Sequence, residues 1–136
     1  MREPSRRLPP RSPERADPRH RIGRQGEDAA ARLYRSAGFA VVARNLRTTL
    51  GELDLVVRRG SLLAAVEVKT RRGGAPERTV GDEELARRAR ALAAVARVLA
   101  PDVRRLRLRV DVAAVVCRKD GTLEVLVLPG RELPCG

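Results

Sequence analysis

The residues best suited to chemistry lie in two neighbouring apolar runs, each interrupted by charged side chains. In the first run, Asp54 stands between Leu53 and Leu55. Strand side chains alternate between two faces, so both leucines are predicted on the face opposite Asp54. In the second run, Glu67 and Lys69 are two residues apart and share a face. Carboxylates and an ammonium group on adjacent strands suit cation binding and contact with a phosphate.

The turn between the runs predicts how they face each other. Gly60-Ser61 fits a two-residue hairpin loop with glycine at the first position of a type II′ turn. This register puts Asp54 opposite Glu67 and Glu52 opposite Lys69, with facing Cβ atoms about 4.5–5.5 Å apart. Two carboxylates this close repel each other, and a hard divalent cation such as Mg²⁺ would relieve the repulsion. The hairpin alone fits equally well with a solvent-facing ladder of salt bridges.

The lysine in this stretch stands out in an arginine-rich chain. Lys69 and Lys119 are the only lysines among 29 basic residues. Lysine is a compact charge whose pKa can move, whereas arginine is planar and permanently charged. A site that contacts both a phosphate and a nucleophilic water favours lysine, so its presence at position 69 supports a chemical role.

A wider set of residues resembles the bacterial YraN-like family, which belongs to the restriction-endonuclease-like superfamily with its Asp…Glu-x-Lys core. The resemblance covers roughly residues 22–128. The matching residues are Gly23, Gly26, Glu27, Ala30, Leu33, Gly38, Asn45, Arg47, the runs 51–55 and 66–71, Arg109 and Asp111.

The resemblance implies a metal-dependent nuclease site. In it Asp54 and Glu67 hold one or two Mg²⁺ or Mn²⁺ ions, and the Val68 carbonyl and Glu27 are further ligands. Lys69 positions the attacking water and the scissile phosphate, which completes the predicted catalytic set.

Two carboxylates have supporting roles in this interpretation. Glu52 would orient Lys69. Glu27 lies on the apolar face of a helix predicted over residues 23–37, and there its charge either complements the positive helix end or reaches over the sheet to the metal. The resemblance favours the second role, whereas helix periodicity alone does not.

The charge of the chain favours a nucleic-acid partner, and the resemblance to nucleases makes DNA the expected one. The net charge is +12, from 29 basic and 17 acidic residues. The strand predicted over residues 105–116 carries several arginines on one face, and this fits a solvated edge or interface as well as a nucleic-acid contact. The candidate phosphate contacts are Arg47, Arg71, Arg72, Arg78, Arg87 and Arg88.

Composition disfavours several other classes of protein. The sole histidine, His20, and two cysteines without CxxC spacing argue against zinc sites, histidine-based catalysis and a disulfide framework. A reducing, cytoplasmic location is expected. No apolar run approaches the ~18 residues of a membrane span. One Tyr and one Phe provide little surface for stacking single-stranded bases.

The order of elements predicts an α/β domain, and the family resemblance implies that its core is restriction-endonuclease-like. A helix, three strands, a second helix over residues 80–100 and two strands would form a mixed central sheet of about five strands flanked by helices. The predicted organisation is a disordered basic Pro/Arg-rich arm over residues 1–20, one domain over 21–130 and a flexible tail over 131–136.

The predicted function is a metal-dependent nuclease that hydrolyses DNA phosphodiester bonds, including branched or repair and recombination intermediates. The main alternative is a non-catalytic basic nucleic-acid-binding protein that retains the nuclease fold. A third interpretation is an assembly module that uses the arginine-rich strand as a dimer edge. Many junction enzymes of this superfamily are dimers, so the resemblance also raises a homodimer as an expectation.

Overall fold

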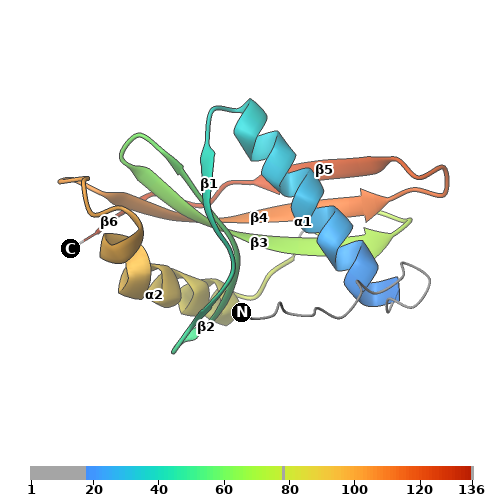
Figure 1. The fold of residues 1–136 in the computed structure, drawn as a ribbon. Helices are drawn as coiled ribbons and strands as arrows, with labels where there is room; N and C mark the ends of the chain where they lie inside the picture. Colours follow the sequence, from blue (N-terminus) through green and yellow to red (C-terminus); the bar gives the residue numbers. More distant parts are fainter. Residues whose placement is uncertain (1–17, 78, 136) are drawn as a thin grey trace, which may run out of the picture.

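The computed structural model describes residues 18–77 and 79–135 (Figure 1), so most of the predicted N-terminal arm and Arg78 lie outside the described residues. The described part folds as one mixed sheet with a helix on each face. Its elements are α1 (Pro18–Ser36), β1 (Ala40–Thr48), β2 (Gly51–Arg59), β3 (Leu62–Arg72), α2 (Asp82–Leu99), β4 (Arg107–Cys117), β5 (Leu123–Leu128) and β6 (Leu133–Pro134).

The strand order is β1-β2-β3-β4-β5, and β6 pairs with β4 beyond the end of β5. β3 and β4 are parallel, whereas the other neighbours are antiparallel. Short turns join β1 to β2, β2 to β3 and β4 to β5, and the parallel pair needs the longer crossover that α2 provides. The predicted α/β class with a mixed sheet and flanking helices is confirmed, and the arrangement is consistent with a restriction-endonuclease-like core.

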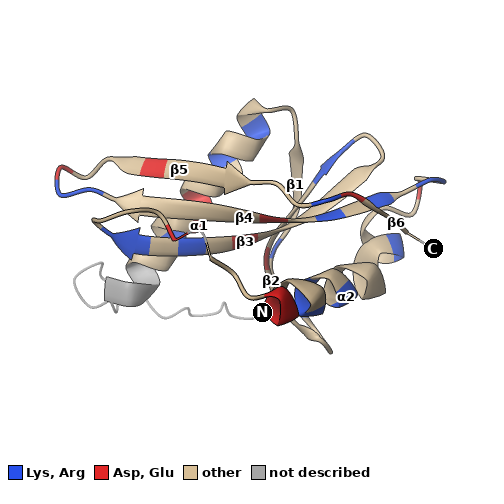
Figure 2. Ribbon diagram, turned by 180° about the vertical axis from the view of Figure 1, so that it is seen from behind, with Lys and Arg blue, Asp and Glu red and all other residues tan. Residues whose placement is uncertain are grey.

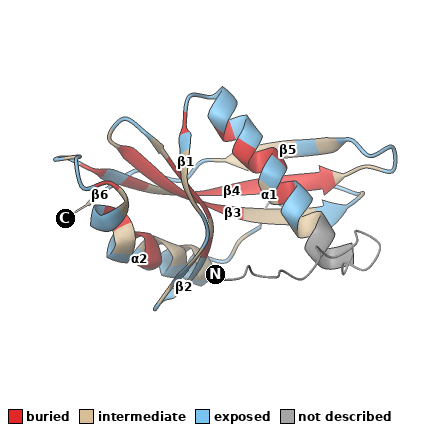
Figure 3. Ribbon diagram, viewed as in Figure 1, coloured by how far each residue is buried: buried red, intermediate tan, exposed pale blue. Residues whose placement is uncertain are grey.

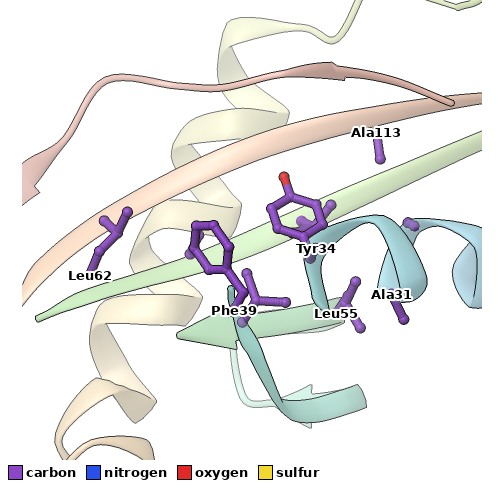
Figure 4. Packing of buried hydrophobic residues seen from close by; sticks show 10 residues of the cluster. Ala31, Tyr34, Phe39, Leu55, Leu62 and Ala113 are labelled. Atoms are coloured by element: carbon purple, nitrogen blue, oxygen red, sulfur yellow. The ribbon is translucent and has the colours of Figure 1, made fainter. Parts of the chain in front are cut away.

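The two helices cover opposite faces of the sheet, so each face has its own apolar core (Figures 1 and 2). On the α1 face, Tyr34 and Phe39 pack edge to face with ring centroids 5.2 Å apart, next to Leu55 (Figure 4). On the α2 face, Leu92 packs with Leu53 and other strand residues. Both sides of β3 are therefore buried along Leu62–Glu67, as Figure 3 shows, which explains its nearly continuous apolar sequence.

The two chain ends differ from the sequence predictions. α1 begins at Pro18, inside the segment 1–20 that was predicted to be disordered, and proline is well tolerated in the first turn of a helix. The tail over 131–136 was predicted to be flexible, but it contains β6. Cys135 N donates to Leu106 O at 3.0 Å, so backbone pairing with the region of β4 holds this segment in place.

The arginine-rich strand is not a sheet edge, which corrects that prediction. β4 lies between β3 on one side and β5 and β6 on the other. Arg107 pairs with Glu132, and Arg109 makes two hydrogen bonds to Asp111 at 2.7 and 2.8 Å. Carboxylates of the same chain neutralise Arg107 and Arg109. Their positive charges therefore require neither open solvent nor a bound nucleic acid as compensation.

Neither helix in residues 18–77 and 79–135 is long and apolar enough to cross a membrane.

Candidate functional site

The site forms where β2 and β3 separate. The predicted hairpin is confirmed: Gly60 has φ of 60°, and Arg59 pairs with Leu62. The ladder continues in this register as far as Leu55 and Val66 and then stops, one step before the predicted Asp54–Glu67 pair.

The alternation of β2 also breaks at this point. Leu53 and Leu55 were predicted on one face, but Leu53 packs in the core under α2 and Leu55 in the core under α1. A regular strand keeps residues i and i+2 on one face, so the irregularity falls at Asp54. The Asp54 carboxylate accepts a hydrogen bond from Val68 N at 3.0 Å and thereby provides an acceptor beyond the end of the ladder.

Separation of the strands removes one predicted contact. Glu52 does not lie against Lys69: it is exposed, and its nearest described cation is Arg47, whose Nε lies 3.9 Å from Glu52 Oε2. Lys69 instead contacts Glu67 and Glu84. The prediction that Glu52 orients Lys69 is therefore wrong in this structure, and Glu84 occupies that position.

A cavity of about 460 Å³ opens beside Asp54 on the α1 side of the sheet. It combines two carboxylates with two arginines at the exit of β3. Its lining residues are Ile22, Gly23, Glu27, Asp54, Val68, Thr70, Arg71 and Arg72.

Close packing of α1 on β3 brings Glu27 to this cavity. A Cβ atom at Gly26 would lie 2.0 Å from Thr70 Oγ1, so only glycine allows the helix to approach the strand this closely. Asn45 Nδ2 donates to Glu27 Oε1 at 3.2 Å, from a left-handed backbone with φ of 50°. The contact of Asn45 with Glu27 carries no local sequence signal, because the two residues are 18 positions apart.

The carboxylate of Glu67 points to α2 and lies among two cations and the carboxylate of Glu84. Glu67 as a whole residue is only 6% exposed. Arg88 Nε donates to Glu67 Oε1 at 2.9 Å, and Lys69 Nζ lies 3.5 Å from Glu67 Oε2. Glu84 Oε2 lies 3.3 Å from Lys69 Nζ and 3.7 Å from Arg88 Nη2. Figure 2 shows the acidic first turn of α2 and the basic residues after it beside β2 and β3.

Burial and mutual repulsion perturb the carboxylates of the site. Burial raises the pKa of Asp54, and the charge of Glu27 raises it further, against the hydrogen bond from Val68. Burial likewise raises the pKa of Glu67, with Asp54 adding to the shift and Arg88 opposing it. For Lys69, burial lowers the pKa, but Glu84 and Glu67 outweigh burial and the net shift is upward. Excess negative charge is thus partly buried around Asp54.

These residues fit a hard divalent cation held by few protein ligands. Asp54 and Glu27 supply oxygen donors at one cavity, and their repulsion is what a cation would relieve. Within residues 18–77 and 79–135, no three His, Cys, Asp or Glu side chains gather as a metal-binding group. The predicted ligands Asp54, Glu67 and Glu27 therefore do not form a preformed three-carboxylate cage. Mg²⁺ commonly uses one or two carboxylates together with water and phosphate oxygens.

Within the described residues, the predicted phosphate-binding arginines separate into three groups. Arg71 and Arg72 are exposed and line the cavity, and Figure 2 shows the basic end of β3. Arg47 and Arg87 are also exposed, away from the cavity lining. Arg88 turns inward to Glu67 with a side chain 19% exposed, so its first role is an ion pair within the protein.

Comparison with known proteins identifies related sequences of undefined activity. The model of the uncharacterised protein family UPF0102 matches residues 26–115. A UPF0102 protein of Syntrophotalea carbinolica is 44% identical over 113 residues, which span 80% of this chain and 89% of the relative. A relative from Symbiobacterium thermophilum is 49% identical over 53 residues, 39% of this chain and 45% of the relative. A Streptomyces griseus relative is 57% identical over 51 residues, 38% and 43% of the two chains.

Proposed function

We propose that this chain, which belongs to the uncharacterised protein family UPF0102, is a divalent-metal-dependent nuclease. The reaction would be hydrolysis of DNA phosphodiester bonds, and we infer it from the site. The observation that carries the proposal is a cavity at which two carboxylates meet two arginines. Asp54 and Glu27 line it together with Arg71 and Arg72. The acidic pair suits a cation and the basic pair suits phosphates, so one site accommodates both parts of a metal–phosphodiester complex.

At the cavity, Asp54 and Glu27 would hold Mg²⁺ or Mn²⁺ together with the Val68 carbonyl, and Glu67 would join them from the α2 side by releasing a cationic partner. A divalent cation bound there supplies Lewis-acid chemistry, which offsets charge on the phosphate and makes water a better nucleophile at neutral pH. Asp54 is anchored by its bond to Val68 N, so its carboxylate keeps one orientation toward the cavity.

Lys69 would act through its positive charge. Its raised pKa keeps the ammonium protonated at neutral pH, so Lys69 donates hydrogen bonds and does not accept a proton. From a position between Glu67 and Glu84, the ammonium orients a water molecule or a phosphate oxygen and stabilises negative charge that develops there.

The substrate would be held by its backbone. Tyr34 and Phe39, the only two aromatic residues of the chain, are buried in the α1 core and present no ring for base stacking. Exposed arginines at the cavity contact phosphates instead, which favours duplex or branched DNA over selection of single strands. A branched repair or recombination intermediate is the substrate we favour.

One observation favours a second candidate, a nucleic-acid-binding protein without catalysis. Arg88 and Lys69 already compensate the charge of Glu67. A site neutralised in this way is stable without a metal. That candidate predicts salt-dependent DNA binding without turnover.

The test is cleavage of labelled linear duplex, single-stranded and four-way-junction DNA in Mg²⁺ or Mn²⁺. The wild type is compared with Asp54→Asn, which retains an oxygen acceptor for Val68 N, and with Glu67→Gln. Asp28→Asn is the matched control, because Asp28 is an exposed carboxylate that pairs with Arg44 outside the cavity lining. We expect metal-dependent cutting that both site variants abolish and the control retains. Binding of every substrate without cutting would support the second candidate and refute the nuclease.

A further inference from the structure

The buried carboxylate of Glu67 already has a cationic partner at each oxygen. Arg88 Nε donates to Oε1 at 2.9 Å, and Lys69 Nζ lies 3.5 Å from Oε2. The side chains of Glu67 and Arg88 are 7% and 19% exposed, so solvent screens this contact only weakly. A divalent cation that takes Glu67 as a ligand must therefore compete with Arg88.

Arg88 also has a second carboxylate within reach. Glu84 precedes it by one helical turn on α2, and its Oε2 lies 3.7 Å from Arg88 Nη2. That distance is long for a hydrogen bond, so the contact is loose in the present arrangement. A small movement of the guanidinium away from Glu67 would convert it into a direct ion pair with Glu84.

We propose that Arg88 is the internal counter-cation of this site and sets its affinity for the divalent cation, by exchanging Glu67 for Glu84 when the cation binds. The inference rests on the proposed function in one respect, the binding of a cation at Glu67. It assigns Arg88 and Glu84 as positioning residues, since each acts through Glu67 or Lys69.

The two residues of α2 then have opposite effects on metal affinity. Loss of Arg88 removes the competitor and leaves the charge of Glu67 poorly compensated in the metal-free protein, so binding of the cation becomes more favourable. Loss of the negative charge of Glu84 removes the alternative partner of Arg88, so the guanidinium stays on Glu67 and binding becomes less favourable. A charge-assisted contact in a partly buried setting corresponds to about a fivefold to tenfold change in affinity.

The experiment is calorimetric titration of the purified full chain with Mn²⁺ in the absence of DNA. The variants are Arg88→Met, which keeps an unbranched side chain without charge, and Glu84→Gln. Exposed residues of the same helix provide controls with the same change in net charge, because Arg90 and Glu83 lie close to Arg88 and Glu84 on α2. Arg90→Met and Glu83→Gln should leave the Mn²⁺ affinity within about twofold of wild type, as expected for screened surface charges.

We expect Arg88→Met to bind Mn²⁺ about fivefold to tenfold more tightly and Glu84→Gln to bind it more weakly by a similar factor. Unchanged affinity in both variants, or tighter binding by Glu84→Gln, would overturn the inference. If Arg88→Met fails to fold, as far-UV circular dichroism would reveal, Glu84→Gln decides the matter alone.

A parallel cleavage assay separates this inference from the proposed function. Opposite affinity shifts without cutting of any DNA would support the counter-cation and refute the nuclease. Metal-dependent cutting with unshifted Mn²⁺ affinities would support the nuclease and refute the role of Arg88 as counter-cation. Absence of Mn²⁺ binding in every variant would refute both.

Discussion

The close approach of α1 to β3 provides the sharpest test of how the site is positioned. Gly26 is buried in α1, and an added Cβ would lie 2.0 Å from Thr70 Oγ1 and 3.1 Å from both Thr70 Cβ and Thr70 Cγ2. Gly23 lies in the same helix, and a Cβ there would meet nothing within 4 Å. Alanine substitutions at these two glycines therefore differ mainly in the contact with Thr70.

The magnitudes follow from two opposing effects. Alanine in a helix interior is favoured over glycine by about 1 kcal/mol, so Gly23→Ala should stabilise the protein by up to about that amount. Gly26→Ala has the same helical gain, but forcing a methyl group into a filled contact costs about 1–3 kcal/mol. The free energy of unfolding of Gly26→Ala should thus lie about 1–3 kcal/mol below that of Gly23→Ala.

Urea unfolding followed by far-UV circular dichroism measures both values, and a double variant identifies the cause. Three atoms of Thr70 lie closest to the new methyl group, and Thr70→Ala removes two of them, Oγ1 and Cγ2. Most of the loss in Gly26→Ala should disappear when Thr70→Ala is combined with it. Equal stability of Gly26→Ala and Gly23→Ala, or a double variant without recovery, would show that the helix does not depend on this contact.

Three further results are expected. The folded protein raises the pKa of Asp54 above that of the unfolded chain. The stability gained from protonated Asp54 is therefore complete below the ordinary carboxyl pKa of about 3.9, and it is lost as the pH rises through the folded-state pKa. Asp54→Asn should therefore raise the urea midpoint at pH 7, and a lower midpoint would contradict the repulsion. Asp111 is 0% exposed and accepts both hydrogen bonds of an arginine, so Asp111→Ala should lower the free energy of unfolding by about 3–5 kcal/mol in the same assay. Arg71→Ala and Arg72→Ala should each lower the slope of log affinity against log salt for DNA binding by about 1, as measured by fluorescence anisotropy. Arg58→Ala should leave that slope unchanged because an aspartate already holds its guanidinium through two hydrogen bonds, and equal slopes in all three variants would exclude the cavity as the phosphate contact.

The hairpin shows how far local sequence determines the fold. A glycine at the first turn position and apolar alternation in the flanking runs fix one register, because a slip by one residue would turn every side chain to the wrong face. The pairing of Arg59 with Leu62 confirms that register. The order of helices and strands along the sequence predicted the mixed sheet, and the family resemblance implied the restriction-endonuclease-like core.

The C-terminal tail shows where this reasoning fails. β6 spans only Leu133–Pro134, too short for any periodic signal, and a proline counts against a strand. The segment is ordered through contacts with β4 and the Leu106 carbonyl, which lie far away in the sequence. The same limit applies to Asp111, whose partner Tyr34 is 77 residues away in α1 and donates its hydroxyl hydrogen bond at 2.6 Å.

The environment of Glu67 could not be predicted from helix patterns. Glu84 and Arg88 are four residues apart, and that spacing usually indicates a pair on the exposed face of a helix. The pair is present, but α2 crosses β2 and β3, so Glu84 also contacts Lys69 and Arg88 also contacts Glu67. The crossing of a helix over a sheet depends on packing of the whole core, and no local motif encodes it.

The opening between β2 and β3 connects the fold to the proposed chemistry. Asp54 accepts the Val68 amide just beyond the last ladder pair, so the residue proposed to hold the cation also terminates the strand pairing. This arrangement leaves Asp54 and Glu67 close enough to raise the pKa of Glu67. Arg88 and Lys69 offset part of that repulsion on the α2 side of the sheet. The chain can therefore fold before any cation binds, and the cation then needs only to displace one internal ion pair, which is why its affinity should depend on α2.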